Sequence, residues 1–447
     1  PWLNVFAQHP LNVGSDFNHE NQATKDWADR ILLYWLQEYN LDGYRFDLSK
    51  GFTQDSTGDV GAWGWYNGNR IALIKRMADV MWGYDPSAYM ILEHFADNGE
   101  EIELSNYWNG ILLWGNASHA YGEAAMGYSN GWNFEQANHQ QRGWNQPHLV
   151  AYMESHDEER LMYKNISFGN SQGNYDIKEL KTELARQELV AAFFFTLPGP
   201  KMFWQFGELG YDVSIDYDCR TCPKPLHWEY YLEPNRKRLF NVYKALIDLK
   251  KNYEALRTTD YSFNVWAATK SIHLNHPSMN VVVLGNFSAA PGAITPSFQH
   301  TGLWFDYLSG DTIEVFDVNA QLNFAPGEYH IYTDQKLPTP DTTTTLVGIE
   351  DHTFNQNGFD FTLSPNPATD YTSINYTLAK EAEVSIAAYN LLGEKVAEIF
   401  DGEQRAGEQR LKWAFGQNEV PQISNGTYII RLEINGNAVG KQMVILK

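Results

Sequence analysis

Residues 41–48 read LDGYRFDL, and this stretch decides the fold. Side chains alternate between the two faces of a β-strand, so the aromatic and aliphatic residues of the stretch point to one face while Arg45 and Asp47 point to the other. We therefore expect a largely buried strand with two charged residues on one face. Charges are unusual on a buried strand, which makes this segment the first place to look for a functional site.

A helix and further strands surround this stretch. Apolar residues recur every three to four positions over 25–39, which predicts an amphipathic helix whose stripe contains Trp27, Ile31, Leu32, Trp35, Leu36 and Tyr39. Beyond it, short apolar runs alternate with helical patterns up to about residue 255, as is typical of a parallel α/β sheet or barrel. The further strands are predicted at 89–92, 111–114, 149–153 and 201–204.

The rest of the chain has the pattern of β-structure. Short alternating runs with turn residues, such as 280–286, 303–308 and 328–333, predict a small antiparallel β domain over 256–336. Residues 337–350 are rich in proline and threonine, which predicts an extended linker. A second all-β unit, 351–447, has the strand spacing of a β-sandwich, with strands predicted at 373–378, 384–389, 409–413, 426–434 and 441–446.

Composition argues against several classes of protein. The 447 residues carry a formal charge of −22 and contain no run of Lys and Arg, which argues against nucleic-acid binding. No stretch approaches the roughly 20 apolar residues that a transmembrane helix needs. Cys219 and Cys222 form a single CxxC, short of the four ligands of a structural zinc site, so we expect either a local structural role or free thiols.

Three acidic residues follow predicted strands directly. Asp47 ends the first strand, Glu93 follows the run YMIL, and Asp157 follows in AYMESHD. One strand–helix unit of a barrel takes about 30 residues, and barrel enzymes keep their catalytic residues at the carboxyl ends of the strands. Glu93 lies 46 residues after Asp47, and Asp157 lies 64 residues after Glu93. The first separation fits one strand–helix unit, and the second fits two.

The three acids suit the retaining route of glycoside hydrolysis. That route needs one carboxylate as nucleophile and a second carboxyl group that acts first as acid and then as base. Arg45 lies on the face of Asp47 and favours the ionised form that a nucleophile requires. The apolar run before Glu93 is expected to raise the pKa of its carboxyl, as suits a general acid. A third acid, Asp157 next to His156, could stabilise the sugar cation or hold its hydroxyl groups.

The segments GYRFDLSK, ILEHF and ESHDEE, in this order, resemble conserved regions two, three and four of the α-amylase family, glycoside hydrolase family thirteen. The resemblance implies that Asp47 is the nucleophile, Glu93 the acid/base and Asp157 the transition-state stabiliser. It also implies that the substrate is contacted by Arg45, Lys50 and His156.

Residues 197–210 similarly resemble the eighth strand of this family and the loop after it. The fold implied is α/β plus all-β. It comprises a partial (β/α)8 TIM barrel over 1–255 with strands four to eight, a β-rich domain C over 256–336, and the C-terminal sandwich.

Two features depart from the family pattern. Gly51 stands where many members have a histidine whose carbonyl helps to bind calcium, so a structural calcium ion stays open, while the chemistry itself requires no cofactor. The first conserved region, an Asp followed by Asn-His on the third strand, has no counterpart, because no apolar strand precedes Asn18-His19. We therefore expect the chain to begin after the third barrel strand and to have little or no activity as it stands.

Several tryptophans and acidic pairs lie near the predicted site. The tryptophans Trp63, Trp65, Trp108, Trp114 and Trp132 fall where loops should rim the site, and each is equally suited to stacking on a glucose ring or to core packing. The pairs Glu100-Glu101 and Glu158-Glu159 are expected to be solvated and to have no role in the site.

Residues 361–447 contain FTLSPNPATDYTSINY, YNLLGEKV and SNGTYIIRLEINGNAVGKQMVILK. They resemble the C-terminal sorting domains of the type IX secretion system of Bacteroidetes. The resemblance implies export by the type IX secretion machinery, with release of the protein or its anchoring at the cell surface through the outer membrane. A fibronectin-like spacer or a carbohydrate-binding module is the alternative, because a sandwich alone does not define a function.

Together, these features predict a secreted retaining hydrolase that cleaves α-1,4-glucosidic bonds of starch-like α-glucans. Two alternatives stay open. A branching or transglycosylating enzyme of the same family uses the same covalent intermediate but transfers the sugar to a hydroxyl group of another sugar. A starch-binding surface protein keeps the barrel without turnover.

Overall fold

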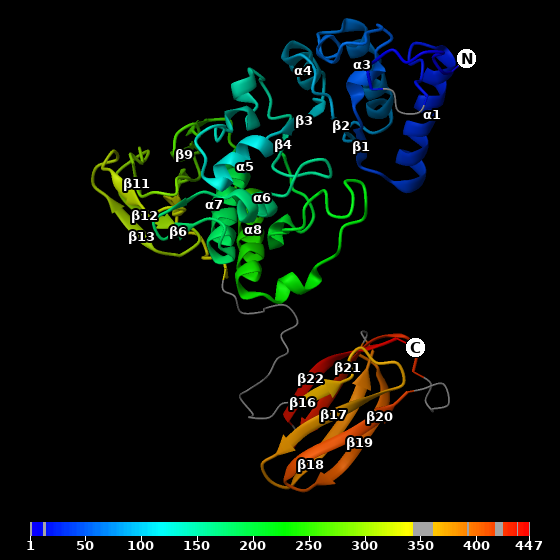
Figure 1. Ribbon diagram of the computed structural model, residues 1–447, viewed down its shortest axis with the longest axis vertical. Coiled ribbons are helices and arrows are strands. Elements are labelled where there is room, and N and C mark those ends of the chain that lie inside the picture. Colours follow the sequence, from blue (N-terminus) through cyan, green and yellow to red (C-terminus); the bar gives the residue numbers. More distant parts are fainter. Residues whose placement is uncertain are drawn as a thin grey trace. The chain divides into compact units, whose positions relative to one another are not determined.

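The computed structural model describes residues 2–11, 15–342, 361–390, 393–415, 423–435 and 437–446. The chain forms two compact units, Pro1–Thr344 and Thr345–Lys447 (Figure 1). Most of the predicted linker, 337–350, and the first ten residues of the predicted sandwich lie outside the described residues. The two units are therefore described separately.

A five-stranded parallel sheet is the centre of the first unit. Its strands lie in the order β1-β2-β3-β4-β7, and every neighbouring pair is parallel. The strands are β1 (Gly43–Phe46), β2 (Tyr89–Leu92), β3 (Leu112–Asn116), β4 (Leu149–Tyr152) and β7 (Lys201–Met202). Within the part of the chain that is described, neither β1 nor β7 pairs with a further strand on its outer edge. The sheet is thus part of a TIM barrel and confirms the expected fold class.

Most of the helices of this unit connect these strands, because neighbouring parallel strands need a crossover connection. They are α1 (Gln22–Tyr39), α2 (Val60–Trp63), α3 (Gly68–Tyr84), α4 (Asn98–Ser105), α5 (Ser118–Met126), α6 (Leu161–Phe168), α7 (Leu180–Thr196) and α8 (Pro234–Asn252). A short hairpin, β5 (Ser171–Gln172) and β6 (Tyr175–Asp176), lies between α6 and α7. Helix α7 carries buried residues on every side, so it lies in the interior of the unit.

Helix α1 corrects part of the prediction. It begins three residues before the predicted helix, where Asn21 caps the N-terminus by accepting a hydrogen bond from the Ala23 amide. Leu32 and Leu36 are buried as expected, but Trp35 and Tyr39 are exposed. The periodicity predicted the helix correctly. The buried face of α1, next to α3, is narrower than predicted, because it does not include Trp35 and Tyr39.

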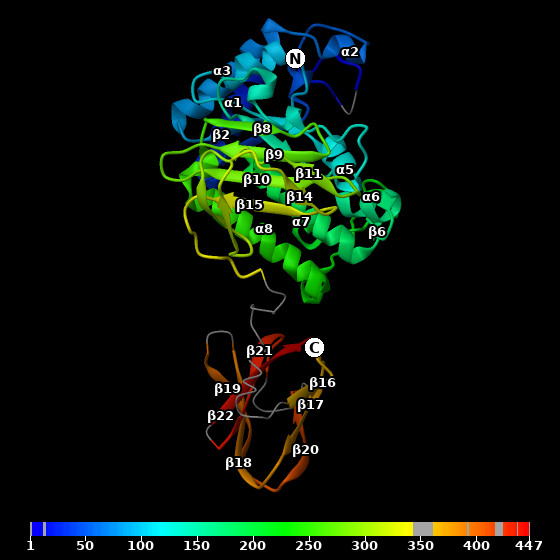
Figure 2. The same ribbon diagram turned by 90° about the vertical axis from the view of Figure 1, so that its left-hand side faces the viewer.

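An antiparallel sheet follows α8 and packs against the helices. Its order is β13-β12-β15-β10-β9-β8, and a two-stranded sheet, β11-β14, lies beside it. The strands are β8 (Tyr261–Asn264), β9 (Thr269–Leu274), β10 (Val281–Asn286), β11 (Gly292–Ile294), β12 (Gly302–Asp306), β13 (Thr312–Val315), β14 (Leu322–Phe324) and β15 (Tyr329–Thr333). Figure 2 shows β8, β9, β10 and β15 side by side. A side chain at Gly285 on β10 would collide with Leu189 and Phe193 of α7, so this glycine permits close packing.

The second unit is a β-sandwich. One sheet has the order β16-β17-β20 and the other the order β19-β18-β21-β22. The strands are β16 (Phe361–Ser364), β17 (Tyr371–Leu378), β18 (Ala382–Tyr389), β19 (Lys395–Gln404), β20 (Gly407–Ala414), β21 (Gly426–Ile434) and β22 (Asn437–Ile445). Their inward-facing residues, including Ile374, Ile386 and Ile430, form a separate core. The sandwich confirms the predicted class, with β16 and β19 in addition to the five predicted strands.

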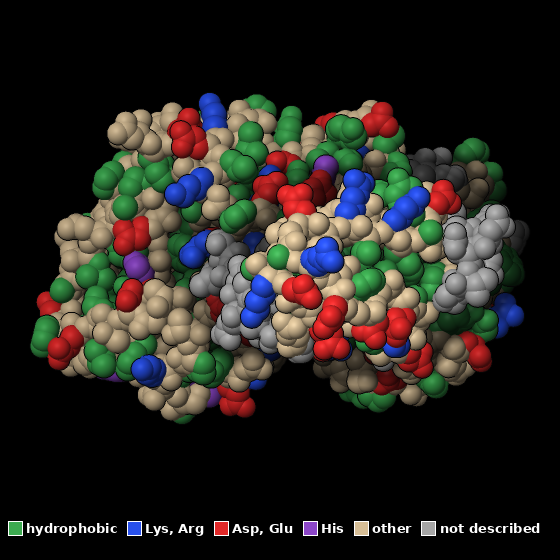
Figure 3. Space-filling view, turned by 90° about the horizontal axis from the view of Figure 1, so that it is seen from below, with side chains coloured by type: hydrophobic (Ala, Val, Ile, Leu, Met, Phe, Trp, Pro, Cys, Tyr) green, Lys and Arg blue, Asp and Glu red, His purple; other side chains and the backbone are tan. Residues whose placement is uncertain are grey.

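The charge of the surface and the hydropathy of the helices bear on whether nucleic acids or membranes are possible partners. On the face drawn in Figure 3, Lys and Arg side chains lie among Asp and Glu side chains and form no continuous basic surface among the described residues. Within the described ranges, no helix is both long enough and apolar enough to cross a membrane.

Candidate active site

Asp47 and Glu93 meet at the carboxyl ends of two neighbouring strands. β1 and β2 are in parallel register with Arg45 opposite Ile91 and Phe46 opposite Leu92, so the residues after each strand emerge side by side. The Arg45 guanidinium contacts both carboxylates, with Nη1 donating to Asp47 Oδ1 at 2.5 Å and Nη2 donating to Glu93 Oε2. One cation therefore joins the two acids predicted to be nucleophile and acid/base.

The two carboxyl groups differ in environment. The Asp47 side chain is 78% exposed, whereas that of Glu93 is only 13% exposed. Burial raises the pKa of Glu93, and the nearby Asp47 carboxyl adds to the rise, while Arg45 and the Leu48 amide oppose it. A carboxyl group with a raised pKa beside one that is open to solvent is the asymmetry that suits an acid/base and nucleophile pair.

Trp114, near the middle of β3, links this pair to the third acid. The Arg45 guanidinium lies over its ring at 4.1 Å from the centroid, and the centroid of the His156 ring lies 6.2 Å from that of Trp114. Trp114 also packs edge-on against Tyr152 of β4. Burial raises the pKa of the Tyr152 hydroxyl, with further contributions from carboxylates that include Glu93 and Asp157. Carboxylates from two of the predicted site segments therefore affect the pKa of the same tyrosine.

Asp157 lies five residues beyond the end of β4 and remains accessible. Its side chain is 60% exposed, and Oδ2 lies 3.3 Å from His156 Nε2. Its backbone amide donates to Ser155 Oγ, and its carbonyl accepts a hydrogen bond from the Arg220 guanidinium. Asp157 is therefore held through its backbone, while its carboxylate is left free to meet a ligand.

A cleft of about 390 Å³ opens beside Asp157. Its apolar side is aromatic, with Trp204, Phe206 and Tyr211, and its other residues include the basic side chains Arg160 and Arg220. Flat aromatic faces next to polar groups suit the binding of sugar rings. The expected strand 201–204 ends at Met202, so Trp204 belongs to the loop that lines this cleft.

A fully buried polar network supports the loops after β1 and β2. Ser49 Oγ lies 2.8 Å from His94 Nδ1, and His94 Nε2 lies 2.7 Å from Glu100 Oε1. Glu100 in turn accepts two hydrogen bonds from Arg70, at 2.7 and 2.6 Å. The Ser49 amide and hydroxyl both donate to the Glu93 carbonyl, at 2.8 and 3.2 Å. The network therefore fixes the backbone that carries Glu93.

The prediction that the acidic pairs are solvated is wrong for Glu100 and Glu101. Both are buried, and Glu101 pairs with Arg142. The second pair is partly buried and also has a role. Glu158 accepts from Asn116 Nδ2 at 2.6 Å, and Glu159 accepts from the Ser214 hydroxyl and the Ile215 amide. The arginine and loop partners are distant in sequence, so the Glu-Glu pattern alone could not reveal them.

Lys50 and the tryptophans occupy distinct places. Lys50 Nζ donates to the Phe95 carbonyl at 3.4 Å and lies over the buried ring of Trp63. Trp65 and Trp108 are exposed. Trp132 contacts the β domain, because its Nε1 donates to the Trp266 carbonyl. Of the five tryptophans, Trp114 lies at the centre of the site. The sequence alone left open whether Trp114 packs in the core or stacks on a sugar ring.

Gly51 lies beside two aromatic rings. A side chain placed at residue 51 would meet the rings of His9 and Trp63, at 3.5 Å and 3.7 Å. Among the described residues, no group of three or more His, Cys, Asp or Glu side chains is placed to hold a metal ion.

The chain has relatives among α-glucan enzymes. It is 24% identical over 279 residues to a cyclomaltodextrinase from a Bacillus species, a match that covers 59% of this chain and 41% of that protein. A 1,4-alpha-glucan branching enzyme from Geobacillus stearothermophilus is 21% identical over 255 residues, which is 52% of this chain and 34% of that enzyme. The chain thus spans less than half the length of these curated relatives.

Solved structures show the same fold. An alpha-amylase from Geobacillus thermoleovorans complexed with acarbose aligns with a TM-score of 0.52 and 14% identity, over 71% of this chain and 65% of that chain. A type I pullulanase from Bacillus subtilis aligns with a TM-score of 0.53 and 17% identity, over 72% of this chain and 48% of that chain. The first unit is homologous to the catalytic region of the α-amylase family.

The sandwich is a secretion sorting domain. Residues 362–446 match the family described as the secretion system C-terminal sorting domain. This indicates secretion or attachment at the cell surface, as the sequence predicted, and implies contact with the secretion machinery. The family model covers 85 of the 447 residues, so this assignment concerns the second unit alone.

Proposed function

We propose that the protein is a retaining glycoside hydrolase that cleaves α-1,4-glucosidic bonds of starch-like α-glucans. The observation that carries the proposal is the bridge of Arg45 between exposed Asp47 and largely buried Glu93. The homology to α-glucan enzymes supports the substrate class.

In the first step, Asp47 attacks the anomeric carbon while Glu93 donates its proton to the departing glycosidic oxygen. The C–O bond to the leaving sugar breaks as the bond to Asp47 Oδ forms. In the second step, Glu93, now ionised, takes a proton from water, and the water oxygen displaces Asp47. The configuration at the anomeric carbon is thereby retained.

The remaining site residues have supporting roles in this proposal. Arg45 holds the Asp47 carboxyl group in place through a charge-assisted hydrogen bond. Asp157 and His156 hold sugar hydroxyl groups and stabilise the positive charge of the oxocarbenium-like transition state. Lys50 contacts the substrate from the segment after β1, where its charge also acts on Glu93. Neither step uses a metal ion or cofactor.

A branching or transglycosylating activity is the second candidate, favoured by the match to a branching enzyme. Its first step is the same, but a glucan hydroxyl replaces water in the second. The outcome depends on whether the cleft beside Asp157 admits an acceptor chain better than water. The products distinguish the two, because branching lowers iodine staining of amylose without a matching rise in reducing ends.

We also propose that residues 1–447 alone turn over little or no glucan. The sheet is open along β1 in the described residues, and the Asp47 carboxylate is mostly exposed to water. A water-exposed carboxylate lacks the enclosed, preorganised surroundings on which enzymatic rate enhancement depends. Robust turnover by this chain would contradict this part of the proposal.

The test uses the full-length product of the gene, incubated with amylose. Reducing ends and iodine staining are followed for the wild type and for Asp47→Asn. We expect reducing ends to accumulate with the wild type and at least a hundredfold less with the variant. Equal activity of the two proteins would overturn Asp47 as nucleophile. Binding of amylose without turnover by the wild type would instead indicate a starch-binding surface protein.

A further inference from the structure

The loop between Leu209 and Trp228 forms one wall of the cleft beside Asp157. Residues 210–227 contain no helix or strand, yet Arg220, Cys222 and Leu226 all line the cleft. A wall of this length without regular structure needs other restraints to keep its shape.

Side-chain contacts supply these restraints at both ends of the loop. Glu159 accepts hydrogen bonds from the Ser214 hydroxyl at 2.7 Å and the Ile215 amide at 2.8 Å. Farther along, the Tyr211 hydroxyl donates to the Pro225 carbonyl at 2.6 Å. The ends of the loop are thus anchored, and the exposed middle, around residue 220, depends on its own restraints.

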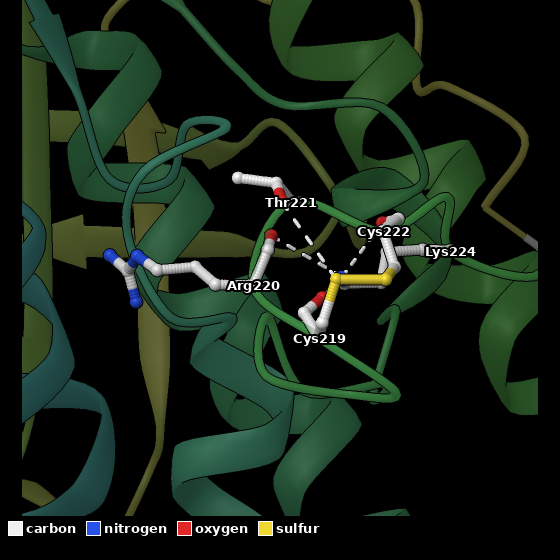
Figure 4. Close-up of a disulfide and its surroundings, with 5 residues drawn as sticks. All are labelled: Cys219, Arg220, Thr221, Cys222 and Lys224. Carbon is white, nitrogen blue, oxygen red and sulfur yellow. Dashed lines mark hydrogen bonds between the residues drawn. A yellow bond between two sulfur atoms is a disulfide. The ribbon is translucent and has the colours of Figure 1, made fainter.

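A disulfide between Cys219 and Cys222 closes this middle into a small ring (Figure 4). The free-thiol alternative for these cysteines is therefore wrong. Lys224 Nζ donates to the carbonyls of Cys219 at 2.6 Å and Cys222 at 2.9 Å, so the ring is braced from one side. Arg220 lies inside the ring, and Figure 4 shows its guanidinium extending away from the sulfur atoms. The ring fixes the backbone from which this side chain projects.

The Arg220 guanidinium reaches the candidate catalytic segment. It donates to the backbone carbonyl of Asp157, and its Nη1 lies 3.6 Å from Asp216 Oδ1. Asp157 has its amide bound to Ser155, so the Arg220 contact restrains the opposite end of the same residue. A shift of the ring would therefore move the Asp157 backbone and the cleft wall together.

We infer that Arg220 is a positioning residue for Asp157 and that the Cys219–Cys222 ring makes this positioning sensitive to thiol reductants. The catalytic part of the inference rests on the proposed function, whereas the structural part does not. Reduction by two equivalents of a thiol converts the disulfide to two protein thiols and the reagent to its disulfide. Cys219 is exposed and hence accessible to such a reagent.

The export indicated by the sorting domain agrees with a disulfide ring that is sensitive to thiol reductants. The sorting domain indicates secretion or cell-surface attachment, and disulfides form and persist outside the cell. We therefore expect the closed ring and ordered Arg220 contact after export, and a loosened wall wherever thiols reach the protein.

Trypsin provides a test on the 447-residue chain itself. Arg220–Thr221 is the only bond between Lys201 and Arg236 that trypsin should cut, because Lys224 precedes a proline. Cleavage is quenched, the sample is reduced and alkylated, and the new termini are quantified by mass spectrometry. We expect dithiothreitol to accelerate this cleavage at least tenfold. The double variant Cys219→Ser, Cys222→Ser should be cleaved fast with or without dithiothreitol. Equal rates in the oxidised and reduced wild type would overturn the role of the ring.

Hydrogen exchange tests the link to Asp157 without relying on turnover. Amides of residues 155–160 should exchange faster in Arg220→Ala and in the reduced wild type, and Arg220→Lys should recover part of the protection. Arg257→Ala, which removes an exposed arginine elsewhere in the unit, is the matched control and should leave this peptide unchanged. Unchanged exchange in Arg220→Ala would overturn the positioning role.

Kinetics on the full-length protein complete the test. Arg220→Ala should lower kcat for malto-oligosaccharides at least tenfold with less than a threefold change in KM, because positioning of Asp157 matters most in the transition state. Wild-type kcat equal to that of Arg220→Ala would refute the catalytic consequence. Absence of turnover by the wild type, together with the expected trypsin and exchange results, would refute the proposed function and leave the thiol-sensitive contact standing.

Discussion

Arg45 contacts Asp47 and Glu93 and stacks on Trp114, so this one side chain controls the charge balance of the site. It lowers the pKa of Glu93, against the rise caused by burial. Its removal should therefore raise that pKa further and leave Asp47 without its cation.

We expect Arg45→Ala in the full-length protein to lower kcat/KM at least a hundredfold, the effect of losing a preorganised electrostatic contact. Because Glu93 then keeps its proton to higher pH, the alkaline limb of the pH–rate profile should shift upward. The measurement is kcat/KM between pH 4 and 9, with Arg30→Ala, an exposed arginine on α1, as control. A downward shift of the alkaline limb would contradict the assignment of Glu93 as acid.

Glu183 on α7 gives a second prediction at the scale of single residues. Its side chain is fully buried, one carboxyl oxygen has no hydrogen-bond partner, and burial raises its pKa to about 8. The folded state therefore binds more protons than the unfolded state between pH about 4.5 and 8, so this group removes stability as pH rises through that window.

Glu183→Gln abolishes this titration and supplies an amide donor. Its free energy of unfolding, measured by urea denaturation, should match that of the wild type near pH 5. Near pH 8 it should exceed that of the wild type by a few kcal/mol, on the order expected for a pKa shift of this direction and size. Glu38→Gln on the exposed face of α1 should show no such divergence. Parallel stability curves for Glu183→Gln and the wild type would contradict the prediction.

At the scale of elements, the network of Arg70 on α3 and Glu100 on α4 joins both helices to the loops after β1 and β2. Both side chains are fully buried. Breaking a buried pair leaves an uncompensated charge, which typically costs about 3–5 kcal/mol, whereas an exposed pair contributes about 1 kcal/mol or less.

Glu103 on the same helix provides the matched control, because it pairs with Lys75 at the surface. We expect Glu100→Gln to lower the free energy of unfolding by about 3–5 kcal/mol. Glu103→Gln should lower it by about 1 kcal/mol or less. Chemical denaturation of the two variants side by side tests this, and equal losses would show that the Arg70 network is not a principal support of the first unit.

The elements show what sequence could and could not predict. The predicted strand 89–92 coincides with β2, because four apolar residues lead directly to Glu93 and leave no ambiguity in its end. β19 escaped prediction, since its ten residues include three acidic ones and alternate only weakly between buried and exposed side chains. The partners of Glu100 and Asp157, namely Arg70 and Arg220, lie 30 and 63 positions away along the chain. Such pairings depend on tertiary packing, which local periodicity does not encode.

At the scale of the whole molecule, the chain consists of two units with separate cores. Units with their own cores tend to unfold independently. Ile272 in β9 and Ile386 in β18 are both fully buried, one in each unit. Truncation of a buried isoleucine to alanine typically costs about 2–5 kcal/mol.

Calorimetry of the whole chain should therefore show two transitions. Ile386→Ala should lower the Tm of one transition, and Ile272→Ala should lower the Tm of the other. A single transition that both variants shift equally would show that the units unfold together.

The central claim is that Asp47 forms the covalent glycosyl intermediate while Glu93 acts as acid and base. The most direct measurement is mass spectrometry of the full-length protein after incubation with a 5-fluoro-α-glucosyl fluoride, whose ring fluorine slows release of the sugar from the enzyme. Trypsin should liberate residues 46–50, FDLSK, in which Asp47 is the only acidic side chain. The account predicts the added mass of one fluoroglucosyl group on this peptide. A label on a peptide that contains Glu93 or Asp157 instead would contradict it.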